Sequence, residues 1–382
     1  DGEPVGAFVR DGVRIDRRTG IAEDKHKFDY EVLPAGTQFQ IRLELVVYSE
    51  LPYFVKHDEL LGMFRAMLEA LADGRIRLGA RTRRGLGRGK VSKWSIQRID
   101  MKNKNHVIAW LRREASAGDQ VPLANLPKPP LGLWPPWFTI EADLELKTSV
   151  LIRSGGEEAR VPDMVHLSEN GQPLLTGTSL AGILRSRCER IARTLFSDEE
   201  AIRITEAMFG TWHRREEPQK QIRAGRVVVE ETKLCNGGHW VQGRVAIDRL
   251  TGGALETALF DEAPYYPDPK PKSPASPGCG VTNARIMIRL CDPNQTEVAL
   301  LLQSFKDLWL GDLPVGGEAG VGRGVFRGRS ATIGHDSFGR VAMTAADPAD
   351  PANVKLEVLE GAGGSAGQIL AELGRLSRET AQ

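Results

Sequence analysis

The sequence predicts an α+β protein in which helices pack on antiparallel β-sheet and one structural module occurs twice. Two observations predict this fold class. A segment that reads Ile-Asp-Arg-x-Thr-Gly occurs twice, and each copy is followed by an alternating apolar segment, an amphipathic segment and a glycine-rich loop. A long internal repeat indicates that one supersecondary unit has been used twice. The same elements are therefore expected in both copies.

The repeated segments span residues 15–28 and 247–260. Their Asp-Arg-x-Thr-Gly centres are rich in turn-forming residues and lie between strand-forming ones, which predicts a β-hairpin with a polar turn. A core requires neither an aspartate nor an arginine at these places, so a shared contact with a ligand is one interpretation. Seven positions recur at a constant offset of 232, namely Ile15, Asp16, Arg17, Thr19, Gly20, Ala22 and Phe28 with Ile247, Asp248, Arg249, Thr251, Gly252, Ala254 and Phe260.

Each hairpin is followed by the pattern of a strand and then of a helix. Apolar residues alternate over residues 39–45 and 286–290, which predicts half-buried strands. Apolar residues then recur at helical spacing over residues 60–71 and 298–308, which predicts amphipathic helices. We assign these apolar stripes to the core.

A Gly-x-Gly-Arg-Gly loop closes each copy, at an offset of 235. Glycine lets backbone N–H groups approach an anion, and arginine supplies charge, so these loops favour phosphate binding; a tight turn between helix and strand is the alternative. A P-loop is excluded because Arg84 and Val91 stand where glycine and Ser or Thr are required. The loop glycines are Gly85, Gly87, Gly89, Gly320, Gly322 and Gly324.

Composition indicates a soluble protein of two domains. The chain has 382 residues with 41% hydrophobic and 26% charged residues, and we expect a cytoplasmic location because no long apolar segment or signal-peptide pattern occurs. The net charge is only +1, yet residues 75–90 hold seven basic residues and no acidic one. The four cysteines show no Cys-x-x-Cys spacing, so we expect thiols without disulfides, and no metal site made by the protein alone.

A proline-rich stretch divides the chain. Residues 114–136 predict an extended linker, so the domains expected are 1–113 and 137–343, followed by a flexible tail over 344–382 with a short helix at 369–377. The second module predicts a strand from Phe138 and a helix over residues 179–196. Its order of strand, helix, strand, then strand, helix, strand is that of a ferredoxin-like sheet. The first copy has only 14 residues before Ile15, so we expect its N-terminal half on another polypeptide or segment.

A third feature precedes the second hairpin. Residues 153–167 form a polar, glycine-bearing loop that contains Asp163, and residues 174–185 predict a strand end, a turn and a helix start. Thr178 or Ser179 is expected to cap that helix and to leave its first N–H groups for an anion. A single aspartate in a loop is more often a turn former than a catalyst.

The helix start, the hairpin and the glycine loop together resemble the RAMP superfamily of CRISPR-associated proteins. More narrowly, they resemble the backbone (Csm/Cmr-type) subunits of type III effector complexes and the fused modules of types III-D and III-E. The resemblance implies two tandem ferredoxin-like (RRM-like) RAMP modules, the first incomplete at its N-terminus, each with a protruding thumb hairpin. The thumbs would wedge between guide RNA (crRNA) and target RNA, and the glycine loops would line the guide backbone.

The resemblance also implies a reaction. Asp163 would cleave target RNA by metal-dependent transesterification, holding Mg²⁺ or another divalent ion or accepting the 2′-hydroxyl proton. Arg153, Arg160 and His166 would neutralise charge on the phosphorane. The RNA-binding residues implied are Arg14, Asp16, Arg17, Arg18, Arg83, Arg84, Arg88, Lys90, Arg153, Arg160, Ser179, Arg185, Arg244, Asp248, Arg249 and Arg323.

Other readings of the sequence remain open. The chain is expected to act with other CRISPR effector subunits. Residues 204–215 lack the zinc-binding cysteines that larger fused effectors have in the corresponding stretch. One alternative is a structural backbone subunit that binds crRNA and target RNA while Asp163 is inert. Others are an unrelated repeat protein that binds protein partners and a guide-processing ribonuclease, for which no histidine stands in a suitable basic setting.

Overall fold

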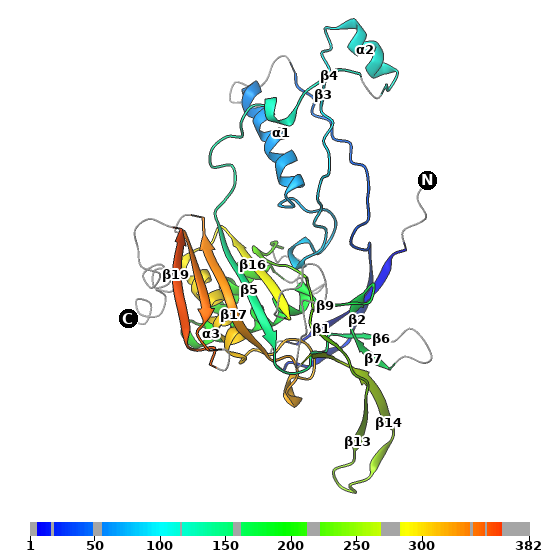
Figure 1. Cartoon of the computed structure of the whole chain (residues 1–382), viewed down its shortest axis with the longest axis vertical. Coiled ribbons are helices and arrows are strands. Elements are labelled where there is room, and N and C mark those ends of the chain that lie inside the picture. The colour runs from blue at the N-terminus through cyan, green and yellow to red at the C-terminus, as the bar shows by residue number, and fades with distance from the viewer. Residues whose placement is uncertain are drawn as a thin grey trace. The chain divides into compact units, whose positions relative to one another are not determined.

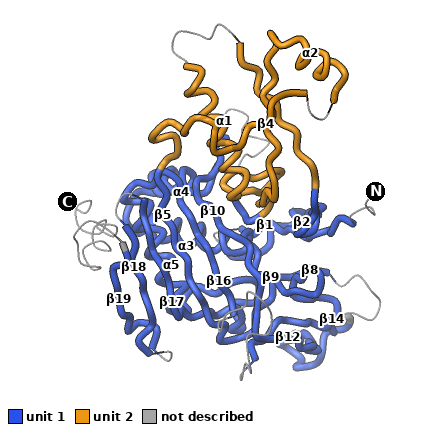
Figure 2. Tube along the Cα trace, turned by 45° about the horizontal axis from the view of Figure 1, so that its top comes forward, with its two compact units in different colours: residues 1–38, 83–85, 136–382 blue, residues 39–82, 86–135 orange. Residues whose placement is uncertain are grey.

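A computed structural model describes residues 6–16, 19–48, 56–114, 117–155, 162–211, 222–268, 283–336, 339–347 and 350–360. The chain forms two compact units (Figure 2), the larger from residues 1–38, 83–85 and 136–382 and the smaller from residues 39–82 and 86–135. The boundary near residue 136 lies where the proline-rich stretch ends. The rest of the division differs from the predicted domains, because the first hairpin belongs to the larger unit whereas residues 39–82 and 86–113 belong to the smaller one.

The larger unit is built on an antiparallel sheet with helices on one face (Figure 1). Its central strands are β5 (Trp137–Leu146), β10 (Val227–Val229), β16 (Ala284–Cys291) and β17 (Phe326–His335), in the order β10-β16-β5-β17. Helix α3 (Gly177–Leu195) connects β5 to β10, and α5 (Gln295–Leu310) connects β16 to β17. This is the ferredoxin-like order predicted for the second module, with an additional helix α4 (Asp198–Phe209) beside α3.

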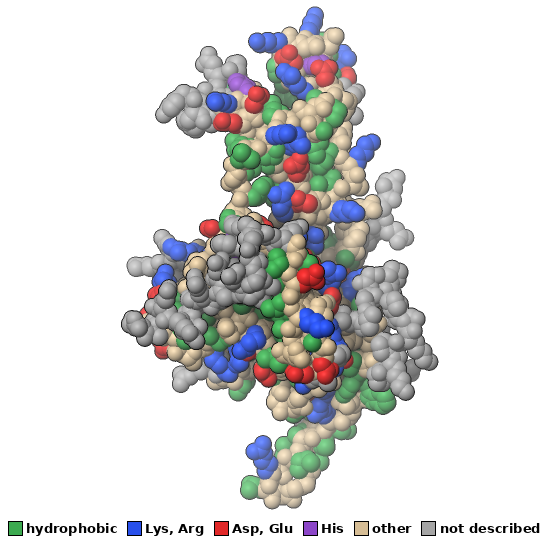
Figure 3. All heavy atoms as spheres, turned by 60° about the vertical axis from the view of Figure 1, so that its left-hand side comes forward, with side chains coloured by type: hydrophobic (Ala, Val, Ile, Leu, Met, Phe, Trp, Pro, Cys, Tyr) green, Lys and Arg blue, Asp and Glu red, His purple; other side chains and the backbone are tan. Residues whose placement is uncertain are grey.

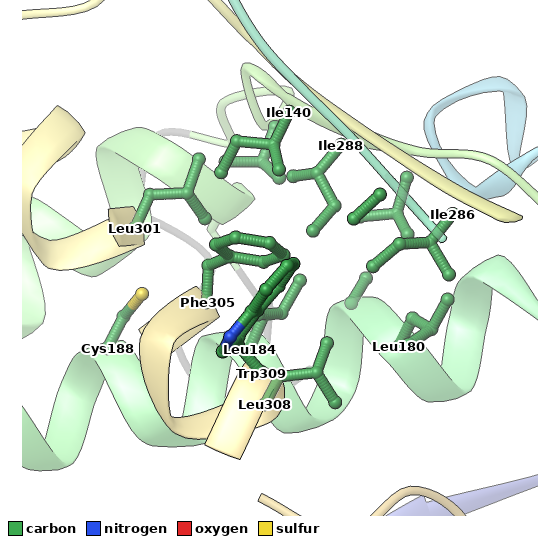
Figure 4. Close-up of a cluster of buried hydrophobic side chains, with 14 of the residues drawn as sticks. Ile140, Leu180, Leu184, Cys188, Ile286, Ile288, Leu301, Phe305, Leu308 and Trp309 are labelled. Carbon is green, nitrogen blue, oxygen red and sulfur yellow. The ribbon is translucent and has the colours of Figure 1, made fainter. Parts of the chain in front are cut away.

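The core lies between this sheet and the helices (Figure 4). Residues of β5 alternate between buried and partly exposed along the whole strand, as the sequence pattern predicts. Helix α3 contributes Leu180 and Leu184 to this core, and α5 contributes Leu301, Phe305 and Leu308. Cys188 of α3 contacts Leu300 and Ser304 of α5. Thr176 caps α3 and Asn294 forms a capping box on α5, so both helices begin at side chains that satisfy their first N–H groups.

Two further strands extend the sheet. β18 (Gly339–Ala345) pairs with β17, and β19 (Val354–Glu360) pairs with β18. The expectation of a flexible tail from residue 344 is therefore wrong for residues 354–360. The proline-rich and aspartate-rich residues before β19 suggested disorder, but the alternating Val354, Leu356 and Val358 supply a strand pattern that pairs with the sheet edge. The helix expected at residues 369–377 lies outside the described residues.

The smaller unit contains α1 (His57–Ala72), α2 (Lys104–Leu111) and the short pair β3 (Gln97–Arg98) and β4 (Asp119–Gln120), with turns of 3₁₀ helix at Thr82–Arg84, shared with the larger unit, and Leu123–Asn125. The amphipathic helix predicted over residues 60–71 is present as α1. The strand predicted over residues 39–45 is not formed, and Phe39 is 61% exposed. An alternating pattern forms a strand only against a neighbour, and among the described residues of this unit none pairs with it. The described part of the first module therefore contains no ferredoxin-like sheet.

Smaller sheets in the larger unit hold the hairpins. β1 (Phe8–Ile15) pairs with β2 (Ala22–Val32), and a four-stranded sheet has the order β13-β14-β7-β6. Its strands are β6 (Arg153–Gly155), β7 (Met164–His166), β13 (Gln242–Ile247) and β14 (Ala254–Ala263). The remaining strands are β8 (Ser168–Glu169), β9 (Gln172–Leu175), β11 (Thr232–Lys233), β12 (Gly237–His239) and β15 (Tyr265–Pro267). In the described part of the chain, no helix has the length and apolar character needed to span a membrane.

Replacing Leu184 with alanine tests the core assignment. The Leu184 side chain is fully buried between α3 and the sheet, so its loss leaves a cavity and is expected to lower the free energy of unfolding by about 2 to 5 kcal/mol. Leu195, at the end of the same helix and 53% exposed, is the matched control, and Leu195→Ala is expected to cost well under about 1 kcal/mol. Urea unfolding of both variants measures the difference. Equal effects would contradict the assignment.

Candidate nucleic-acid interface

The two hairpins have the same strand register. Val13 lies opposite Lys27 and Val245 lies opposite Leu259, and in both hairpins the register shifts before the pairs Ile15 with Ala22 and Ile247 with Ala254. Every one of these pairs is related by the offset of 232 seen in the sequence. The repeat therefore specifies one hairpin structure, irregularity included. The second hairpin, β13–β14, projects from the body of the larger unit (Figure 1).

The recurring aspartate and threonine build the turns. Asp16 accepts the backbone N–H of Thr19 at 2.8 Å, and Asp248 accepts that of Thr251 at 3.2 Å. The glycine that follows each threonine has positive φ, +73° at Gly20 and +69° at Gly252. The repeated aspartate, threonine and glycine of the turn thus have a structural role, which the sequence interpretation did not assign. A role of Asp16 or Asp248 in RNA binding stays a prediction.

The hairpins expose apolar and basic side chains. At the tip of the second hairpin Leu250 is 97% exposed and Ile247 is 59% exposed, and Arg249 is exposed between them. Ile21 is 68% exposed in the first turn, whose Arg17 and Arg18 lie outside the described residues. Green and blue side chains are visible on the projecting hairpin in Figure 3. Exposed apolar side chains on a projecting element indicate a contact surface.

An arginine holds the base of the first hairpin. Arg10 is 4% exposed, and its guanidinium donates to Glu231 at 2.7 Å and pairs also with Glu169. Next to it, Asp11 accepts the backbone N–H of Gly155, the last residue of β6, at 3.2 Å. The first hairpin is thereby attached to the strand that enters the loop of Asp163. Arg10 lies outside the repeated motif, so no sequence pattern pointed to it.

A buried carboxylate holds the base of the second hairpin. Glu262 on β14 is fully buried, and burial raises its pKa. Arg323 and Arg244 lie within 3.3 Å of its carboxylate, and Glu318 lies in the same cluster. Burial would raise the pKa of Glu318, but hydrogen bonds from Glu262, Arg323 and Arg153 lower it to about 2. The cluster therefore keeps Glu318 ionised and joins the hairpin to the second glycine loop.

Three of the predicted RNA-binding arginines belong to this cluster. Arg323 is 4% exposed and also donates to Ser149 and Gln242, so its guanidinium is used inside the protein. This placement corrects the expectation that Arg323 lines an RNA backbone. Arg244 is 35% exposed, and Arg153 is 51% exposed while it pairs with Glu318 at 2.8 Å. Arg160 lies outside the described residues.

Asp163 lies at the foot of the second hairpin. It immediately precedes β7, which runs parallel to β14 with Met164 opposite Glu262. The Asp163 side chain is exposed, and its Oδ2 accepts the backbone N–H of Asp261 at 3.0 Å. The loop that Asp163 ends is therefore anchored at one end to the first hairpin, through Asp11, and at the other end to the second.

The described residues around Asp163 contain no protein cage for a metal. No three His, Cys, Asp or Glu side chains are grouped for metal binding in the part of the chain that the structure describes. Magnesium, however, is commonly held by one or two carboxylates together with substrate phosphates and water. An exposed carboxylate such as Asp163 fits that second arrangement.

His166 is buried and neutral. It is 1% exposed, its Nδ1 accepts the N–H of Ile152 at 3.1 Å, and its Nε2 lies 3.0 Å from the carbonyl oxygen of Leu174. Burial lowers the pKa of His166 to about 4, with a further contribution from His239. The imidazole therefore remains uncharged near neutral pH and faces the interior. The expectation that His166 neutralises charge on a phosphorane is corrected by this placement.

The two glycine loops are equivalent at an offset of 237, not 235. Positive φ values recur at Gly79 and Gly316 (+86° and +90°), Arg81 and Glu318 (+55° and +60°), Gly85 and Gly322 (+94° and +87°), and Gly87 and Gly324 (+72° and +76°). The 3₁₀ turns Thr82–Arg84 and Ala319–Val321 have the same offset. The offset of 235 matched the two Gly-x-Gly-Arg-Gly segments by residue type. The backbone conformation of the two loops is instead defined by the residues with positive φ.

The corrected register changes which residues correspond. Gly85 corresponds to Gly322 and Gly87 to Gly324, so Gly89 and Gly320 have no glycine counterpart. A Cβ at Gly87 would overlap the carbonyl oxygen of Leu78, and a Cβ at Gly324 would overlap that of Val315. These two glycines therefore allow a close backbone approach in a tight turn. Arg88 and Arg323 are not equivalent.

The basic residues of the first loop differ in exposure. Arg88 and Lys90 are exposed, whereas Arg83 and Arg84 are half-buried. The Arg84 guanidinium donates to the carbonyl oxygen of Phe209 at 3.4 Å. On the first hairpin, Arg14 pairs with Glu23 at 2.9 Å. Arg185 is half-buried on α3.

The start of α3 is covered by the protein itself. Thr176, not Thr178 or Ser179, is the capping residue, and its Oγ1 accepts the N–H of Ser179 at 3.3 Å. A Cβ at Gly177 would overlap the carbonyl oxygens of Arg84 and Val229. The expectation that this helix start is left open for an anion is therefore corrected. The first glycine loop occupies it.

The comparisons identify the family. Residues 3–90 and 143–327, well over half of the chain, match the RAMP superfamily. The chain belongs to the RAMP superfamily. Each of the two matched stretches contains one hairpin and one glycine loop. No curated protein matches the chain.

One feature of this RAMP chain was not expected from its cysteines. Cys188 and Cys291 are free thiols, but Cys235 is disulfide-bonded. The expectation of four thiols without disulfides is therefore wrong for Cys235. Sequence spacing failed here because a disulfide depends on distance in the fold and not on distance along the chain.

The buried His166 predicts a pH dependence of stability. An unfolded histidine binds a proton near pH 6.5, whereas folded His166 resists protonation until about pH 4. The unfolded state therefore binds more protons between these values, and stability is expected to fall as the pH is lowered through that range, by up to about 3 kcal/mol from this group. Denaturant unfolding from pH 7 to pH 4 measures the slope.

His166→Gln is the control for this prediction, because glutamine can accept one hydrogen bond and donate another without titrating in this range. In the variant, the slope of the free energy of unfolding against pH is expected to decrease by an amount that corresponds to at most one bound proton. An unchanged slope would show that another group causes the pH dependence.

Proposed function

We propose that this chain is a crRNA-binding backbone component of a type III CRISPR effector, which holds the guide–target duplex and cleaves target RNA with Asp163. RAMP proteins work with RNA in CRISPR complexes, so the superfamily match supports the part of the proposal that concerns RNA binding in such a complex. The observation that carries the finer assignment is the position of Asp163, an exposed carboxylate at the foot of a projecting hairpin.

The hairpins support a role in separating or displacing bases. Leu250 and Ile247 would insert beside bases, because contact with the face of a base removes the apolar surface of these exposed side chains from water. Arg249 would contact a phosphate next to that base. The two hairpins share one register, so both would contact RNA in the same way at two positions along a duplex.

Asp163 would act on the nucleotide held at the second hairpin. Its carboxylate would accept the proton of the 2′-hydroxyl as that oxygen attacks the adjacent phosphorus. The bond to the 5′-oxygen would break to leave a 2′,3′-cyclic phosphate and a 5′-hydroxyl, whose proton would come from water. A divalent ion shared with the RNA would supply charge neutralisation at the phosphate. The N–H of Asp261 holds the carboxylate by a hydrogen bond, and Arg153, which is 51% exposed, pairs with Glu318 in the cluster around Glu262.

Identification of the bound RNA tests the RNA-binding part of the proposal. The chain, purified with its natural partners, is expected to carry short RNAs that share a repeat-derived tag. Sequencing of that RNA is the measurement. Absence of co-purifying RNA would favour an unrelated protein-binding role.

Asp163→Asn tests cleavage. Asparagine keeps an oxygen for the Asp261 N–H but accepts no proton, so cleavage of a labelled target in the purified complex is expected to fall by about 100-fold or more, with target binding retained. Glu357→Gln, which neutralises an exposed carboxylate on β19, is the control. Cleavage at the wild-type rate in Asp163→Asn would leave a structural backbone subunit with an inert aspartate as the better description.

Arg249→Ala tests the second hairpin. Loss of one phosphate contact is expected to weaken RNA binding at all sequences and to reduce the slope of log Kd against log salt by about 1. Arg285→Ala removes another exposed arginine, on β16, and is the control, since Arg285 pairs with Glu141 on the sheet. Titrations of labelled RNA at several salt concentrations measure both slopes. Equal slopes in the two variants would exclude the hairpin from the RNA contact.

A further inference from the structure

The first glycine loop makes a contact whose counterpart on the second loop is open. We name residues 82–85 the first docking turn and residues 319–322 the second docking turn. Gly177 and residues 229–231 form the acceptor site. The carbonyl of Arg84 lies against Gly177, and Gly85 lies against the backbone of Glu230 and Glu231, so closely that a Cβ on either glycine would overlap. The closest contacts are made by the backbone of the turn, and the Arg84 guanidinium adds a hydrogen bond to the carbonyl oxygen of Phe209.

The second docking turn has the same backbone, but among the described residues no counterpart of the acceptor site lies against it. Glu318 and Gly322 repeat the positive φ values of Arg81 and Gly85. Val321, which corresponds to Arg84, is 64% exposed, and a Cβ on Gly322 would meet no atom within 4 Å. Because the first docking turn binds through its backbone, a turn with the same backbone can bind the same kind of site.

The second docking turn is also held rigid from behind. Val321 N–H donates to the carbonyl of Glu318 at 3.1 Å, Gly322 N–H donates to that of Ala319 at 3.0 Å, and the Glu318 carboxylate pairs with Arg323 at 2.7 Å. A left-handed non-glycine residue costs conformational energy, and here the cluster beneath the second hairpin stabilises it. The turn is therefore preformed, which lowers the entropy lost on binding.

We infer that the second docking turn binds the acceptor site of another ferredoxin-like RAMP module, namely a strand end beside a helix that begins with glycine. The acceptor site of this chain is occupied by its own first docking turn. Copies of this chain are therefore not expected to bind one another, and the partner is a module whose acceptor site is vacant. The inference rests on the internal repeat and does not depend on cleavage by Asp163.

A full-length variant that vacates its own acceptor site provides the test. Gly85→Trp places a side chain against the Glu231 backbone and is expected to release the first docking turn, which faster hydrogen exchange at the amides of Gly177, Thr178 and Glu231 would show. Released acceptor sites then bind the second docking turn of a neighbouring copy. Because such contacts are head-to-tail, the weight-average mass in sedimentation is expected to rise roughly twofold or more, whereas the unaltered chain stays monomeric.

Two double variants decide the outcome. Gly85→Trp with Val321→Asp is expected to remain monomeric, while Gly85→Trp with Leu359→Asp, an exposed apolar residue on β19, is expected to associate. Association that survives Val321→Asp, or a Gly85→Trp variant that opens its acceptor site and stays monomeric, would overturn the inference. Unchanged hydrogen exchange at Gly177, Thr178 and Glu231 in Gly85→Trp would overturn the contact on which the inference rests. Loss of RNA affinity in Val321→Asp, without any effect on association, would assign the turn to RNA instead.

Discussion

The buried carboxylate of Glu262 is the constraint on which the geometry of the candidate site depends. A carboxylate that loses all contact with water is costly unless cations and hydrogen bonds compensate it. Arg244 of β13 and Arg323 of the second glycine loop supply that compensation, and Arg153 of β6 lies 3.6 Å away. One buried residue thus draws two strands and a loop together. Glu262 also pairs across the sheet with Met164, the residue that follows Asp163.

This arrangement separates the residues that hold the site from those that face solvent. The arginines closest to Glu262 are the more buried ones, while Arg249 and Leu250 at the hairpin tip are exposed. A hairpin that projects into solvent has few contacts of its own, so its direction is set at its base. Breaking a buried ion pair by removing one partner costs about 3 to 5 kcal/mol, which makes the base the stable part of the structure. An exposed aspartate beside that base is then held in a fixed place relative to the tip.

The sequence was informative where one pattern specifies one local structure. Alternation over residues 138–146 predicted β5, and helical spacing predicted α1, α3 and α5. The repeated hairpin segments predicted two hairpins, and the two have the same register shift. It was uninformative where the outcome depends on a distant partner. Residues 39–45 alternate in the same way as β5, yet no strand lies beside them among the described residues. Arg323 and Arg88 each lie between two glycines in the sequence. Arg323 is buried because it pairs with the carboxylate of Glu262, which is 61 positions away.

The glycine loops show why identical residues in two repeats need not occupy structurally equivalent positions. Gly-x-Gly-Arg-Gly occurs in both loops, but the backbone places the first loop two residues out of step with that match, because the left-handed residues and not the arginines define the turn. Three of those four positions are glycine in both loops, and the fourth is Arg81 in one and Glu318 in the other. A non-glycine residue with positive φ in both copies shows that the turn is constrained by its fold and not by its composition. In the first loop that fixed backbone shape lies against Gly177; in the second the same shape is formed beside the hairpin base.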